Sequence, residues 1–133
     1  MFTDATLNTD NYYFNYTILI LLILSTNLTQ YQYDEIENFG EVIENYIEVL
    51  FNREFLYNNP SIINIDEVLM SKFVALKLSV ILLYSPEWTI KLKLNSIQVE
   101  EIRTKARNIL EELQIEYIEP LKFARQFISI DWL

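Results

Sequence analysis

The expected fold is decided by residues 73–83, which read Phe-Val-Ala-Leu-Lys-Leu-Ser-Val-Ile-Leu-Leu. Lys77 carries the only charge in this stretch, and apolar side chains lie nearly all the way round a helix drawn through it. Such a helix must be covered by other elements. We therefore predict a helix over about residues 65–84 at the centre of an all-α bundle, with Asn64 and Glu67 forming its capping box.

The rest of the chain also shows helical spacing of apolar residues, and no linker or repeat divides it. Residues 89–94 alternate between apolar and polar side chains, which leaves a short helix and an extended link both open. Gly40 lies within the second predicted helix and suggests that another helix crosses there. We predict one domain over residues 1–133 with about five helices, the third of them central. The other four are expected over residues 10–29, 34–57, 96–117 and from 120 onward.

Composition excludes several classes of protein. The chain has one Gly and three Pro, too few turn residues for a β-sandwich and no material for a Gly-rich phosphate loop. It has no Cys and no His, so it lacks a thiolate nucleophile, the commonest general base and the commonest transition-metal ligand. We therefore predict no enzymatic activity, no catalytic or metal-binding residues and no cofactor.

The net charge is −9 and is unevenly distributed. Residues 1–71 hold eleven acids and one base, whereas residues 72–133 hold eight acids and nine bases. An acidic surface repels the phosphate backbone, so we expect no direct binding to nucleic acid.

Residues 11–33 carry no charge and must be considered as a membrane span. Their strongly apolar core covers only residues 18–24, whereas a spanning helix needs about twenty apolar residues. Two aspartates, Asp4 and Asp10, stand where a signal peptide would be basic. We therefore favour a buried helix in a cytoplasmic protein and keep a small membrane-associated protein as the third alternative.

Four acidic residues of the second predicted helix follow spacings of four, three and four: Glu37, Glu41, Glu44 and Glu48. They lie within about 60° of arc and span roughly 16 Å of helix axis. Such like-charged neighbours cost a few tenths of a kcal/mol per pair. This pattern indicates a negative ridge that docks on a basic protein, or a merely solvated face. The leading hypothesis is a non-catalytic interaction module of the inhibitor, immunity-protein or nucleic-acid-mimic type.

Aromatic and apolar residues near both ends of the chain indicate self-association. The candidate residues are Tyr12, Tyr13, Tyr16, Trp132 and Leu133. Aromatic side chains are enriched in interface cores, and chain ends are normally polar unless tied down. We therefore expect a homo-oligomer. The alternative function is a self-associating structural or assembly subunit. The frequent use of Asn, Ile, Tyr and Lys is typical of an A/T-rich genome, such as that of a virus, a plasmid or a low-GC microbe, which is consistent with a viral or mobile-element origin.

Overall fold

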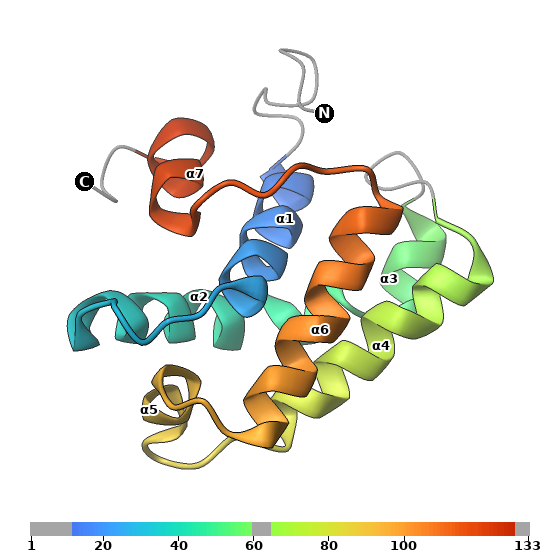
Figure 1. The fold of residues 1–133 in the computed structure, drawn as a ribbon. Helices are drawn as coiled ribbons and strands as arrows, with labels where there is room; N and C mark the ends of the chain where they lie inside the picture. Colours follow the sequence, from blue (N-terminus) through green and yellow to red (C-terminus); the bar gives the residue numbers. More distant parts are fainter. Residues whose placement is uncertain (1–11, 60–64, 130–133) are drawn as a thin grey trace.

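The computed structural model describes residues 12–59 and 65–129, and this part of the chain is all-α (Figure 1). Helices make up 73% of it, without any strand. The all-α class predicted from the sequence is therefore confirmed, but the described residues form seven helices rather than about five. The helices are α1 (Tyr12–Ser25), α2 (Tyr33–Leu50), α3 (Arg53–Asn58), α4 (Glu67–Ile81), α5 (Trp88–Lys93), α6 (Ile97–Glu112) and α7 (Pro120–Phe127).

Helix α1 lies at the centre of the bundle. Its residues 18–24 are all Ile or Leu, and each exposes 3% or less of its surface. Helices α2, α6 and α7 pack around it (Figure 1). Full burial of an Ile or Leu side chain contributes about 1.5–3 kcal/mol, so this uncharged segment supplies a large part of the core.

Helix α4, which the sequence predicts to be central, lies at the edge instead. One face of it packs on α6 and α3, whereas Leu82, just beyond its end on the opposite side, is 84% exposed. The prediction is wrong because α1 already occupies the centre. The apolar content of a helix shows that it is not stable in water alone. It does not show how many other helices of the same molecule pack against it. The buried residues of α4 are Leu69, Met70, Phe73, Leu76 and Val80.

Side-chain caps set where the helices begin. The side chain of Asn52 accepts the Phe55 N–H at 3.1 Å and starts α3, which splits the second predicted helix into α2 and α3. The side chain of Asp66 accepts the Leu69 N–H at 2.8 Å and starts α4. The predicted cap, Asn64, lies outside the described residues. Each such cap satisfies a backbone donor that the first turn of a helix leaves unpaired.

Cations from the second half of the chain bind the backbone at the end of α1. Arg103 Nε donates to the Thr26 carbonyl at 3.1 Å, and Arg107 Nε donates to the Ser25 carbonyl at 3.2 Å. In the segment that follows α1, Lys93 Nζ donates to the Thr29 carbonyl at 2.9 Å. The last carbonyls of a helix lack partners within it and carry partial negative charge. The uneven charge of the sequence thus has a structural use, because bases of the second half satisfy carbonyls of the first.

Helix α5 crosses α2 at Gly40, as the sequence suggests. A Cβ placed on Gly40 would overlap the Thr89 methyl group and would lie 3.7 Å from the Trp88 ring. Only a residue without a side chain permits this approach. The crossing brings Trp88 to the side of α2 that carries the acidic residues.

Candidate interaction surfaces

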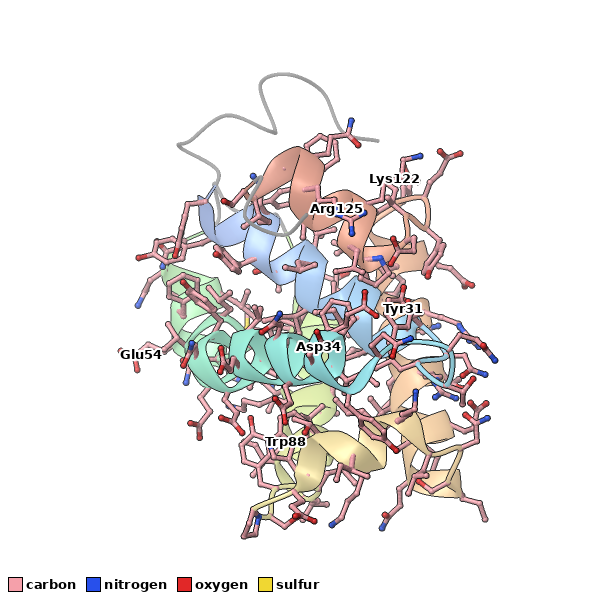
Figure 2. All side chains as sticks on the ribbon, turned by 90° about the vertical axis from the view of Figure 1, so that its left-hand side faces the viewer. Tyr31, Asp34, Glu54, Trp88, Lys122 and Arg125 are labelled. Atoms are coloured by element: carbon pink, nitrogen blue, oxygen red, sulfur yellow. The ribbon has the colours of Figure 1, made fainter. Side chains whose placement is uncertain are left out.

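The solvent side of α2 is acidic (Figure 2). The helix begins with a capping box between Gln32 and Glu35, and Asp34 and Glu35 lie in its first turn, where the helix dipole favours negative charge. Its buried residues pack against α1 and α5, and no Lys or Arg occurs within it. All four predicted glutamates are exposed, and we call them the acidic stripe: Glu37, Glu41, Glu44 and Glu48.

One side of the acidic stripe contacts the segment between α4 and α5. Trp88 Nε1 donates a hydrogen bond to the Glu44 carboxylate, and the Trp88 ring lies 4.8 Å from the Tyr84 ring. Burial, reinforced by Glu44 and Glu48, raises the pKa of Tyr84 to about 12. Sequence reasoning missed this cluster because its members lie about forty residues apart and only the crossing at Gly40 brings them together.

The other side of α2 borders a pocket of about 500 Å³ towards α7. Asp34 and Glu41 line it together with the rings of Tyr16 and Tyr46, which are stacked with centroids 4.3 Å apart. Arg125 of α7 borders the same pocket, and Figure 2 shows it above Asp34. Carboxylates beside aromatic rings form a surface suited to cationic side chains.

The tyrosines predicted for self-association pack largely within the chain. Tyr12 forms a hydrogen bond to the Tyr46 hydroxyl, and this bond, together with burial, raises the pKa of Tyr12. Tyr16 is half-buried against Tyr46, and Tyr13 lies edge-on to Phe55. Tyr12 and Tyr13 each keep 45% of their surface exposed. The other two predicted residues, Trp132 and Leu133, lie outside the described residues.

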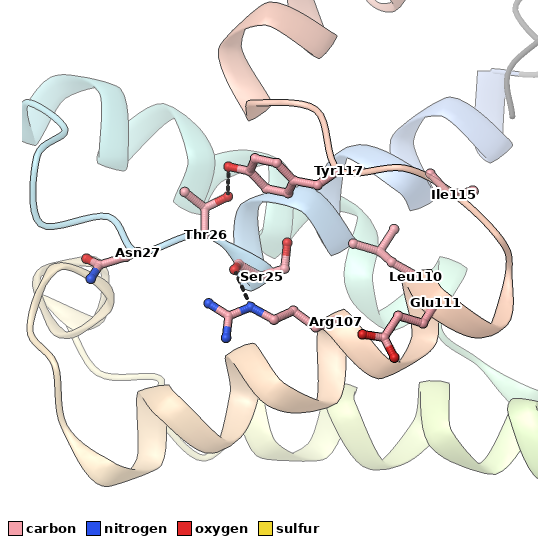
Figure 3. A pocket seen from close by; sticks show the side chains of 8 residues that line it. All are labelled: Ser25, Thr26, Asn27, Arg107, Leu110, Glu111, Ile115 and Tyr117. Carbon is pink, nitrogen blue, oxygen red and sulfur yellow. Dashed lines mark hydrogen bonds between the residues drawn. The ribbon is translucent and has the colours of Figure 1, made fainter.

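A second pocket, of about 420 Å³, lies beside the end of α1 (Figure 3). It contains the bond from Arg107 to the Ser25 carbonyl and a 2.8 Å hydrogen bond between the hydroxyls of Thr26 and Tyr117. Four of its lining residues, Ser25, Thr26, Arg107 and Tyr117, are therefore already engaged in these two bonds. They join α1, α6 and the segment before α7, which indicates a structural role.

No group of three or more His, Cys, Asp or Glu residues that could hold a metal ion occurs within residues 12–59 and 65–129. Within the same ranges, no helix combines the length and the apolar character needed to cross a bilayer. Comparison with known proteins finds no matching family model, curated protein or solved structure.

Proposed function

We propose that this protein is a non-catalytic interaction module whose acidic stripe binds a basic surface of another protein. The observation that carries the proposal is that all four glutamates are exposed along one side of α2. None of them takes part in an ion pair with another described residue. Each i,i+4 pair of like charges costs a few tenths of a kcal/mol, which a basic partner would offset.

The charge around the acidic stripe supports a basic partner rather than an uncharged one. Residues 12–59 hold seven acids and one base, a net charge of −6. A concentrated field of one sign speeds the encounter with oppositely charged proteins, and exposed charges contribute less to the final contact. We therefore expect the acidic stripe to act mainly on the association rate.

The experiment compares two variants of equal charge. The first replaces the acidic stripe with Gln, and the second replaces four exposed acids elsewhere. Both change the net charge from −9 to −5, so total charge is matched. Gln at position 44 can still accept the Trp88 N–H through its amide oxygen. The control positions are Glu101, Glu111, Glu112 and Glu116, which lie on α6 or just after it.

The partner is first captured on the wild-type chain at low salt, and its binding kinetics are then measured with each variant. We expect the stripe variant to lose about tenfold or more in association rate and the control variant to lose much less. Binding of the wild type should weaken with salt, because the screening length falls from about 10 Å at 0.1 M to about 3 Å at 1 M. Equal losses in both variants would contradict the proposal.

A further inference from the structure

The outer side of α4 is apolar although it lies in solvent. Val68, Leu78 and Leu82 expose 65%, 55% and 84% of their surfaces. Together with two small exposed residues they repeat at spacings of three and four, within about 80° of arc. This alternation is typical of helices that pack against each other along their length. We call these five residues the outer seam: Val68, Ser71, Ala75, Leu78 and Leu82.

Polar groups border the outer seam on both sides: Arg53 donates to the Ser71 hydroxyl at 3.0 Å, and Lys105 donates to the Ser79 hydroxyl at 2.7 Å. On the side of α3, Arg53 forms an ion pair with Glu67. On the side of α6, Lys72 forms an ion pair with Glu112. An apolar strip within a polar rim is the usual arrangement of a protein–protein interface. Because acids and bases both border the seam, it presents no charge of a single sign and fits an uncharged apolar surface.

The charge distribution favours a second copy of the same chain as the occupant of the outer seam. Residues 65–129 hold nine acids and nine bases, whereas residues 12–59 have a net charge of −6. Two copies would repel each other through their α2 faces but not through α4. Figure 1 places α2 and α4 on opposite sides of the molecule, with α1 and α6 between them. Contact through the outer seams therefore keeps the two acidic faces apart.

We propose that the outer seam binds a second copy antiparallel, across a two-fold axis beside Ala75. The order of side-chain sizes fits this arrangement, because Leu78 of one copy then meets Ser71 of the other. At the ends, Leu82 meets Val68, and the two Ala75 residues let the backbones approach closely. A parallel pair would instead place Leu78 against Leu78 and leave a gap at Ser71. The antiparallel contact is isologous, as in most homodimers.

The outer seam is shorter than a standard interface, which buries about 800 Å² on each partner. We therefore expect a reversible dimer whose population rises with protein concentration. Sedimentation equilibrium over a concentration series measures it directly. Because the contact is apolar and each copy carries a charge of −9, added salt should leave the dimer unchanged or strengthen it. Binding of a basic partner through α2 has the opposite salt dependence, so the two proposals fail independently.

The first variant is the double substitution Leu78→Lys and Leu82→Lys. Both side chains are exposed, so the fold and the thermal midpoint of the monomer should be unchanged. We expect dimerisation to weaken at least tenfold, although the variant carries less net negative charge. The matched control places Lys at two exposed apolar residues outside α4, Ile90 and Ile97. A wild-type chain that stays monomeric at every concentration, or equal effects of both variants, would overturn the proposal.

Single cysteines test the orientation, because the natural chain has none. A disulfide requires Cα atoms about 4.4–6.8 Å apart, which only a residue beside the two-fold axis achieves with its own copy. Ala75→Cys should therefore form a disulfide-linked dimer on mild oxidation, whereas Ser71→Cys and Leu82→Cys should not. Ser71→Cys mixed with Leu78→Cys should give a cross-linked heterodimer. Equal self-cross-linking at all three positions would overturn the antiparallel arrangement.

Discussion

Helices α1 and α4 are both apolar around most of their circumference, yet they differ in how much of that surface is buried. In α1 every residue from Thr17 to Ser25 is buried, whereas in α4 only one face is buried. Three helices surround α1, and two flank α4. The apolar content of a helix therefore indicates how much of its surface should avoid water. Whether that surface is buried within the monomer depends on how the other helices pack around it.

The largest expected difference between the two helices is in the free energy of unfolding that is lost when one leucine in each is truncated. Leu21 of α1 is fully buried, whereas Leu82 at the end of α4 is 84% exposed. Leu21→Ala should lower the free energy of unfolding by about 2–5 kcal/mol, because it removes buried methyl groups and leaves a cavity. Leu82→Ala should change it by less than about 0.5 kcal/mol. Chemical denaturation at low protein concentration measures both, and similar losses would show that α4 is not an edge helix.

The arginines that contact the two helices should also differ in how much they contribute to stability. The Arg103 side chain is 1% exposed and binds the Thr26 carbonyl, whereas Arg53 next to α4 is 48% exposed. Arg103→Met should destabilise the fold by about 1–3 kcal/mol, because it leaves the part-buried Thr26 carbonyl without its donor. Arg53→Met should cost less than about 0.5 kcal/mol, because exposed ion pairs contribute little. Thermal melts of both variants check this, and a larger loss for Arg53 would contradict it.

The start of α4 should respond locally when its cap is removed. Asp66→Ala deletes the acceptor of the Leu69 N–H and should cost about 1 kcal/mol. Hydrogen exchange should rise in the first turns of α4 and stay unchanged in α1, because packing on one face leaves α4 free to open locally. Faster exchange throughout the molecule would mean that the two helices unfold as one unit.

Tyr84 follows the last turn of α4 and should affect stability only at high pH. Its pKa is raised from 10.0 to about 12, chiefly by burial and further by Glu44 and Glu48. The folded state thus holds the proton more tightly than the unfolded chain does. This contribution is complete below pH 10 and is lost as the pH rises through about 12.

Tyrosinate absorbance of the wild type minus that of Tyr84→Phe isolates this titration. Replacing both glutamates with Gln should move the midpoint down towards 10. An unchanged midpoint would show that burial alone sets the pKa of Tyr84.

Helix positions were largely predictable from the sequence. The predicted helix over residues 96–117 corresponds to α6 (Ile97–Glu112), because apolar residues at helical spacing define one face. Asn52 is a good cap residue, but it lies in the middle of an apolar pattern that hides the start of α3. In α5 the buried residues Trp88 and Leu92 are four apart, which favours a helix over the extended alternative.

The candidate surfaces were predictable only in part. The exposure of the acidic stripe follows from spacing within one helix. The hydrogen bond from Trp88 to Glu44 does not, because it depends on how α5 crosses α2. For the same reason the outer seam is invisible in the sequence, where α4 looks like a helix covered on all sides.

The hydrogen bonds from Arg103 and Arg107 to the end of α1 affect how the chain folds while it is being synthesised. Arg103 and Arg107 lie 77 and 82 residues after the carbonyls that they bind. Ribosomes add about 5–20 residues per second, so α1 emerges roughly 4–16 s before α6 can cover it. During that interval the nascent chain displays seven consecutive Ile and Leu residues without their cover. The newly made protein should therefore depend on chaperones that bind apolar segments until its second half has emerged.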